Sequence, residues 1–319
     1  MRVTAPQNGN LTAKLVREQQ SLAKPAWMRI RPPTSDRFTD IKRLLKEKKL
    51  NTVCVEARCP NISECWSGDG KSGGTATFMI MGDTCTRACR FCMVKSGNPK
   101  GVLDPEEPRN LVEAVGIMKL DYAVLTCVTR DDLADGGARH WADCLNALKV
   151  AYPSLIIELL ISDLNGNIDA LKKILDSGPN VLGHNLETVK RLQGAVRDPR
   201  AGYSKSLDIL RCAKRMGAAY TKTSLMLGLG ETRKEVIQTM EDARAVDADI
   251  ITFGQYLRPS AFHLPVKEYV KPARFEYYKN LAKEMGFLYC ASGPFVRSSY
   301  RAGEHFIKNI ISKDVSGKI

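Results

Sequence analysis

The sequence predicts an α/β protein built on a partial (β/α)6 TIM-like barrel with N- and C-terminal extensions. From about residue 75, short apolar runs alternate with longer amphipathic ones, which is typical of parallel strands joined by helices. The strand runs are almost continuously apolar, as strands buried on both faces are. Six such units are too few to close an eight-unit barrel, so we expect an open one.

The expected strands cover residues 75–81, 122–128, 155–162, 181–182, 220–227 and 250–257. The expected helices cover 109–119, 139–151, 168–176, a stretch that begins near Leu186, an apolar repeat from Val236 to Val246, and 272–285. We expect residues 71–286 to form the barrel, 1–70 an N-terminal extension and 287–319 a C-terminal one. Active sites of such folds lie at the carboxyl ends of the strands.

The composition is that of an ordinary globular protein, with 44% apolar and 26% charged residues in a chain of 319. No apolar run reaches the roughly 18 residues that cross a bilayer, and the N-terminus lacks the apolar stretch of a secretory signal. We therefore expect a cytoplasmic protein, with a mitochondrial presequence as the alternative because the N-terminus is basic. In a reducing compartment, clustered cysteines are more often metal ligands than disulfides.

The net charge of +13 is concentrated at the start of the chain, where residues 1–50 hold 12 Lys/Arg and 4 Asp/Glu. A solvated surface is the simplest explanation of any charge run. Two functional interpretations compete with it, contact with nucleic acid and docking of an acidic protein. No nucleic-acid motif accompanies the charge, which favours a protein partner.

Two groups of three cysteines carry the candidate chemistry. The first has the spacing C-x4-C-x5-C and the second, directly after the first strand, C-x3-C-x2-C; they are Cys54, Cys59 and Cys65, and Cys85, Cys89 and Cys92. Iron–sulfur clusters are held mainly by cysteine thiolates. Structural zinc takes four ligands, commonly as two C-x2-C pairs, and no such pair or nearby histidine completes the second group. Three ligands leave one iron of a 4Fe–4S cluster open to a small molecule, which indicates redox or radical chemistry.

The second spacing, with Phe91 before its last cysteine, resembles the radical S-adenosylmethionine (SAM) superfamily. The two groups together resemble the lipoyl synthase family, and the similarity extends over nearly the whole chain. It includes KPAWMRIRPP at 24–33, VTRDDLADGGA at 128–138, GHNLETV at 183–189, YSKSL at 203–207, LMLGLGET at 225–232, QYLRPSAFHLPVKEYV at 255–270 and SGPFVRSSY at 292–300.

This resemblance implies a sulfurtransferase with two 4Fe–4S clusters and SAM. The second cysteine group would hold the cluster that cleaves SAM to a 5′-deoxyadenosyl radical. The first group, with Ser299 as a fourth ligand, would hold an auxiliary cluster that gives up its sulfur. The implied reaction inserts two sulfur atoms at C6 and C8 of an octanoyl chain on a lysine of a carrier protein. An oxygen ligand holds iron less tightly than a thiolate does, so Ser299 would let one iron leave.

The implied partners are octanoylated lipoyl carrier proteins, namely dehydrogenase E2 lipoyl domains and the glycine cleavage H protein. A reductase such as ferredoxin or flavodoxin and an iron–sulfur carrier are implied as well, but no nucleic acid and no membrane. Lipoyl carrier domains are typically acidic, which fits the basic N-terminal region. Two alternatives are a methylthiotransferase on the same fold and a zinc-stabilised nucleic-acid-binding protein. Metal analysis separates the second alternative, because it requires zinc in place of iron.

Contacts to SAM are expected from loops after the fourth and fifth strands. Asn185 and Glu187 follow the fourth strand, and Gly228, Gly230 and Glu231 follow the fifth. A lone glycine pair is more often a tight turn, and Asn185 and Glu187 could equally cap a helix. Lys222, on the fifth strand, is a further candidate for the carboxylate of the cofactor.

Overall fold

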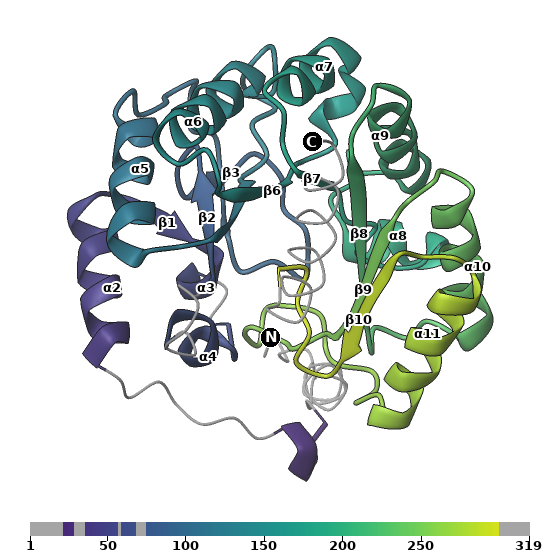
Figure 1. Cartoon of the computed structure of the whole chain (residues 1–319). Coiled ribbons are helices and arrows are strands. Elements are labelled where there is room, and N and C mark those ends of the chain that lie inside the picture. Colours follow the sequence, from purple (N-terminus) through teal and green to yellow (C-terminus); the bar gives the residue numbers. More distant parts are fainter. Residues whose placement is uncertain (1–21, 29–35, 57–58, 68–74, 300–319) are drawn as a thin grey trace, which may run out of the picture.

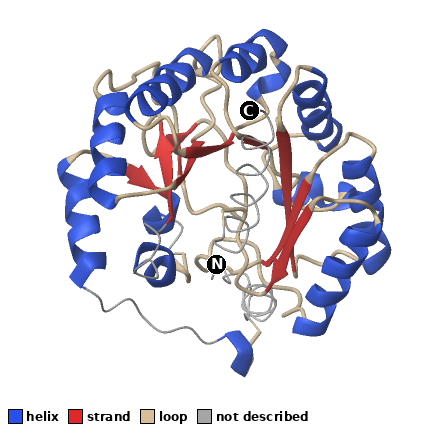
Figure 2. Cartoon of the chain, viewed as in Figure 1, coloured by secondary structure: helices blue, strands red, loops and turns tan. Residues whose placement is uncertain are grey.

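A computed structural model describes residues 22–28, 36–56, 59–67 and 75–299 of the chain (Figure 1). Its main feature is one eight-stranded sheet in the order β1-β2-β5-β6-β7-β8-β9-β10, with a separate two-stranded sheet of β3 and β4. From β2 to β10 all neighbouring strands of the large sheet are parallel, and β1 alone is antiparallel to its neighbour. The sheet curves with its helices on the outside, as Figure 2 shows, and β1 and β10 are its two edges.

The strands are β1 (Asn51–Thr52), β2 (Thr75–Ile80), β3 (Thr84–Cys85), β4 (Lys95–Ser96), β5 (Tyr122–Cys127), β6 (Ile156–Leu160), β7 (Val181–Gly183), β8 (Tyr220–Leu227), β9 (Ile250–Gln255) and β10 (Tyr289–Gly293). The longer helices are α2 (Asp36–Glu47), α5 (Glu107–Met118), α6 (Ala138–Ala151), α7 (Ile168–Asp176), α9 (Tyr203–Arg215), α10 (Arg233–Arg244) and α11 (Pro272–Glu284). Short helices are η1 (Ala26–Met28), α3 (Val53–Glu56), α4 (Ile62–Ser67), η2 (Leu164–Gly166), η3 (Lys190–Leu192) and α8 (Gln193–Val196).

The predicted fold class is confirmed. The six predicted strands are β2 and β5–β9, and they lie side by side in chain order. The structure adds one strand from each predicted extension, because β1 pairs with β2 and β10 continues the parallel sheet beyond β9. The domain boundaries themselves stay predictions. No helix in the described part of the chain is long and apolar enough to span a bilayer.

One predicted helix is wrong. The chain does not turn helical near Leu186, because the next residue continues alongside β8: the Glu187 N–H donates to the Ser224 carbonyl at 3.0 Å, and Met226 N–H donates to the Glu187 carbonyl at 2.8 Å. Glu187 also has a φ of +66°, a left-handed conformation that does not start an α-helix. The first long helix after β7 begins only at Tyr203. This difference places Glu187 beside β8, just after the carboxyl end of β7, instead of on a helix.

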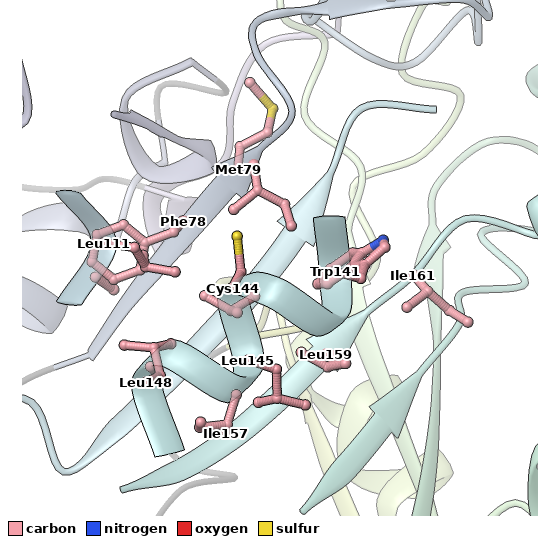
Figure 3. Close-up of a cluster of buried hydrophobic side chains, with 14 of the residues drawn as sticks. Phe78, Met79, Leu111, Trp141, Cys144, Leu145, Leu148, Ile157, Leu159 and Ile161 are labelled. Carbon is pink, nitrogen blue, oxygen red and sulfur yellow. The ribbon is translucent and has the colours of Figure 1, made fainter. Parts of the chain in front are cut away.

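The core lies between the sheet and its helices. Figure 3 shows the part under α6, where Trp141, Leu145 and Leu148 pack on strand residues that include Phe78 and Leu159. The spacing of these α6 residues places them on one helix face. A second cluster joins β8 and β9 to α10 and α11. Burying each such side chain contributes about 1.5–3 kcal/mol, so the sheet is a rigid base for the loops at its carboxyl ends.

Candidate functional site

The second cysteine group lies in a loop at the carboxyl end of β2. Cys85 ends β3, and the pairing of β3 with β4 closes the ends of this loop on each other. Two backbone N–H groups donate to the Cys85 sulfur, from Thr129 at 3.3 Å and Arg87 at 3.4 Å, and the Asp198 N–H donates to the Cys89 sulfur at 3.3 Å. Hydrogen bonds to ligating sulfurs are one means by which proteins tune iron–sulfur clusters. The loop therefore fits a cluster with three cysteine ligands.

The spacing of the sulfur atoms does not fit a single zinc ion. Tetrahedral zinc with bonds of about 2.3 Å brings its sulfur ligands within about 4 Å of one another. In the described part of the chain, the only group whose three candidate ligand atoms lie within 4.8 Å is Glu107, His140 and Cys144. Neither cysteine group meets that limit, as expected for thiols that surround a larger cluster.

The group of Glu107, His140 and Cys144 has a structural explanation. The Glu107 carboxylate accepts hydrogen bonds from the Met81 N–H at 2.8 Å and from the His140 ring at 2.6 Å. Cys144 belongs to the apolar core in Figure 3, where burial raises the pKa of its thiol. The carboxylate thus fixes the turn between β2 and the cysteine loop.

Burial disfavours the thiolate forms of Cys89 and Cys92. Burial raises the pKa of Cys92 to about 12 and also raises that of Cys89. Metal binding replaces the thiol proton, so it removes the cost of a buried thiolate. A bound metal would therefore favour the thiolate forms of Cys89 and Cys92 that burial disfavours.

Charged residues that the sequence analysis did not single out surround this loop. Arg87, between the first two cysteines, is buried and pairs with Asp131 and Asp163 at 2.9 and 2.7 Å. Asp131 follows β5 and Asp163 follows β6. Their position directly after the strands was the signal that could have identified them, because parallel strands gather functional residues at that edge.

The predicted residues after β7 also face the loop. Asn185 donates to the Glu187 carboxylate at 3.1 Å. Burial raises the pKa of Glu187, against the opposing charge of Arg197. The Glu187 charge in turn acts on the thiols of Cys89 and Cys92. The structure therefore brings Asn185 and Glu187 to the second cysteine group.

Arg197 is a further residue that sequence reasoning missed. It is 7% exposed, and its Nε has no hydrogen-bond partner among the residues that the structure describes, although one Nη donates to Ser206 at 2.9 Å. A buried guanidinium nitrogen without a partner is costly. Its charge acts on both Cys89 and Glu187, so it offers an unused donor near the cysteine loop.

The glycine loop after β8 closes on its own glutamate. Gly228 and Gly230 have φ values of +97° and +104°, which glycine adopts without strain. The Glu231 carboxylate accepts from the N–H groups of Gly228 at 2.6 Å and Leu229 at 2.9 Å. Contact of Gly228, Gly230 and Glu231 with a cofactor stays a prediction, and their local bonds explain the motif as a tight turn.

Lys222, which the sequence analysis considered for the carboxylate of the cofactor, pairs with Glu158 in the structure. Its Nζ lies 2.8 and 2.9 Å from the two carboxylate oxygens of Glu158, and Tyr122 donates to the same carboxylate at 2.6 Å. Tyr122 is the first residue of β5 and Lys222 the third of β8. Glu158 is the middle residue of β6, so this buried ion pair lies within the sheet.

The first cysteine group meets the C-terminal part of the chain. Cys54 lies in α3 and Cys65 in α4, both buried, with Cys59 between these helices. Burial raises the pKa of Cys54 to about 11. Burial also raises the pKa of Cys59, although the positive charge of Arg297 opposes this rise. The Asn61 amide donates to the Phe295 carbonyl at 2.6 Å.

These contacts bridge the two edges of the open sheet. The chain after β10 also crosses the end of β9, since Gln255 N–H donates to the Pro294 carbonyl at 3.4 Å. The first cysteine group therefore lies between β2 and the segment that includes Ser299, and the second group lies in the loop after the same strand β2. Ser299 itself is half-buried, and its role as a ligand stays a prediction.

Comparisons with known proteins agree with this arrangement. Residues 79–243 match the radical SAM superfamily. The chain is 49% identical to the mitochondrial lipoyl synthase of Medicago truncatula, over 98% of this chain and 83% of that protein. It is 53% identical to the mitochondrial lipoyl synthase of Candida glabrata, over 91% and 75%, and 50% identical to the chloroplastic lipoyl synthase of Arabidopsis thaliana, over 93% and 75%.

Two solved structures share the fold at 16% identity. They are the hydrogenase maturase HydG, with a TM-score of 0.53 over 68% of this chain and 50% of that one, and methylornithine synthase (PylB), with a TM-score of 0.50 over 73% and 67%. At this identity they support the partial barrel alone. The identity to lipoyl synthases, by contrast, extends over nearly the full length and includes both cysteine groups. The chain belongs to the lipoyl synthase family of the radical SAM superfamily.

Proposed function

We propose that this protein inserts two sulfur atoms, at C6 and C8, into an octanoyl chain carried on a lysine of a lipoyl carrier protein. The observation that carries the proposal is that both cysteine groups lie beside β2, the first in α3 and α4 and the second in the loop that follows the strand, while the first group also meets the segment after β10. Both target carbons lack a neighbouring group that would acidify their hydrogens. Acid–base catalysis therefore cannot activate them, and radical chemistry from a cofactor can.

Cys85, Cys89 and Cys92 would hold a 4Fe–4S cluster whose open iron binds SAM. When bound, the clusters and SAM would supply an electron, a carbon radical and sulfide. Arg197 fits the carboxylate of SAM, because its buried Nε has a donor to spare. Asn185 and Glu187 fit polar groups of the same cofactor, since they face the cysteine loop.

Cys54, Cys59 and Cys65 would hold the auxiliary cluster, with Ser299 as its fourth ligand. The contacts of Asn61 with Phe295 and of Cys59 with Arg297 support this assignment. They bring the first cysteine group to the segment that carries Ser299, across the sheet opening. Arg297 would help to offset the negative charge of the bound thiolates.

Apolar side chains beside the second cysteine group would protect the reaction from water. Phe91 of the cysteine loop packs with Leu229, Tyr256 and Val266. Excluding water from a radical site prevents side reactions, and fixing the alkyl chain holds its reacting carbon in place. A carrier-bound substrate suits such a site because only the narrow alkyl-lysine arm has to enter.

The carrier protein would dock through the basic N-terminal region. In the described part of that region, Lys42, Lys46 and Lys49 are exposed on or just after α2, whereas Lys48 pairs with Glu113. A basic surface speeds encounter with an acidic partner. Raising the ionic strength is therefore expected to weaken carrier binding more than it slows cleavage of SAM alone; equal sensitivity of both would contradict electrostatic docking.

The cellular setting belongs to the same proposal. A reductase such as ferredoxin or flavodoxin would supply electrons, and an iron–sulfur carrier would rebuild the auxiliary cluster. Location in the cytoplasm stays a prediction, because the relatives named above are mitochondrial or chloroplastic proteins. Fractionation of the native cells, followed by detection of this chain, tests it.

The decisive experiment is an assay with an octanoyl-lysine peptide, SAM and dithionite, with mass spectrometry to count the sulfur atoms gained. The reconstituted protein should add two. Cys54→Ala should add none yet still form 5′-deoxyadenosine, whereas the control Cys212→Ala should remain active. Ser299→Ala should lose sulfur insertion, and its neighbour Ser298→Ala should keep it. Sulfur insertion by Cys54→Ala at the normal rate would refute the donor role of the first group.

A further inference from the structure

The cysteine loop is fastened to the barrel by the Arg87 side chain. Its guanidinium donates two hydrogen bonds to each of two carboxylates: to Asp131 at 2.9 and 2.9 Å, and to Asp163 at 2.8 and 2.7 Å. The side chain of Arg87 is 4% exposed and that of Asp163 is 0% exposed. Burial alone would lower the pKa of Arg87, but its bonds to Asp163 and Asp131 outweigh that and raise it.

The bonds of Arg87 with Asp131 and Asp163 form one brace of the loop, and Asp198 and Arg200 form a second. Asp198 accepts a hydrogen bond from the Ala88 N–H at 2.9 Å, and Arg200 donates to Asp198 at 2.8 Å. Arg200 also donates to the Thr86 carbonyl at 2.6 Å and lies 3.3 Å from Asp131. Asp131 thus joins both braces.

None of these bonds uses a thiol. They connect side chains and backbone groups of the loop to segments after β5, β6 and α8, which the core already fixes. Buried bidentate pairs between arginine and carboxylates are rigid in both distance and direction. The braces therefore do not depend on a metal to hold the loop in shape.

We propose that Arg87, Asp131 and Asp163 are positioning residues that hold the cysteine loop ready for the cluster before iron arrives. The inference rests on the proposed function for the identity of the cluster, but not for the braces themselves. A preorganised loop loses less conformational entropy when it binds its cluster. The same bonds fix Cys85 and Cys89 relative to the loops that face the cofactor.

The test is hydrogen exchange of residues 85–92 in the full-length, metal-free protein. Asp163→Asn removes the charge but keeps an oxygen that caps η2, where Asp163 accepts from the Asn165 N–H at 3.0 Å. The matched control is Asp176→Asn, which alters an exposed pair with Lys172. Exchange in the loop should speed by at least about tenfold in Asp163→Asn, because breaking a buried pair is costly, and should not change in the control.

A second readout uses the reconstituted protein. Iron should pass to a chelator faster from Asp163→Asn than from Asp176→Asn. Arg87→Lys should be intermediate, since lysine keeps the positive charge but lacks the paired hydrogen bonds of a guanidinium group. If Asp163→Asn does not fold, Asp131→Asn replaces it, because Asp131 is more exposed. Equal loop exchange in variant and control would overturn the proposal. Faster exchange together with an inactive wild-type protein would instead refute the proposed function and leave the braces intact.

Discussion

Replacing Lys222 by methionine tests the buried ion pair within the barrel. The side chains of Lys222 and Glu158 are 5% and 1% exposed, so the variant leaves a carboxylate in the interior that still accepts a hydrogen bond from the Tyr122 hydroxyl at 2.6 Å. Breaking a buried pair by removing one partner costs about 3–5 kcal/mol. Methionine has a similar length to lysine, so lost packing adds little.

The cost has an upper limit that depends on pH. A buried carboxylate that has lost its partner cation can take up a proton. For a free glutamate side chain, with a pKa of about 4.3, protonation costs about 3.7 kcal/mol at pH 7 and about 1 kcal/mol at pH 5. The loss of unfolding free energy in Lys222→Met should therefore be about 3–4 kcal/mol at pH 7 and clearly smaller at pH 5. The double variant Glu158→Gln/Lys222→Met should recover most of it.

Urea titration at the two pH values measures these differences. Lys172→Met is the control, because its pair with Asp176 is exposed on both sides and contributes no more than about 0.5 kcal/mol. A loss below about 1 kcal/mol at pH 7, or an equal loss at both pH values, would refute the reasoning. If Lys222→Met were fully stable but bound SAM poorly, a cofactor contact for this lysine would be the better explanation.

Three further predictions concern a turn, a histidine and the metal content. Gly228→Ala should lower the free energy of unfolding by more than about 2 kcal/mol in urea titration, because its Cβ would lie 2.2 Å from the Gln255 amide. The control Gly217→Ala has a similar φ of +91° but open space around the added Cβ, so it should lower stability less. Equal losses in the two variants would exclude the clash as the cause. Burial lowers the pKa of His184 to about 4, so only the unfolded state takes up its proton between about pH 6.5 and 4. About 3 kcal/mol of stability should thus disappear as the pH falls through that range, and a profile unchanged in His184→Asn would contradict this. Cys85→Ala should reduce iron from about eight to about four atoms per chain, measured by metal analysis; retention of eight would exclude it as a ligand.

The sequence predicted the barrel well because its signals are local. Runs of apolar residues mark β2 and β5–β9 regardless of what they pack against, and short loops force neighbouring strands together. The spacing of Cys85, Cys89 and Cys92 is also local, so it identified the loop and its chemistry. The resemblance to one family then supplied the role expected of Ser299.

The sequence missed what depends on residues far apart in the chain. Asp131 and Asp163 lie 44 and 76 residues from Arg87, and no periodic pattern connects them. The left-handed backbone at Glu187 and its hydrogen bonds to β8 overrode a stretch that resembles the start of a helix. Lys222 does lie on the fifth predicted strand, β8, but its buried partner is Glu158, 64 residues away in the chain.

The sequence by itself thus determined the six central strands and the cysteine loop, since both follow from short-range patterns. Only the tertiary structure decided which charges meet. It placed Asn61 and Cys59 against the segment that leads to Ser299, and it left Arg197 with a buried donor to spare. The physical reason is that the pairing of charges depends on where strand ends come together in space, and packing of the whole sheet sets that position.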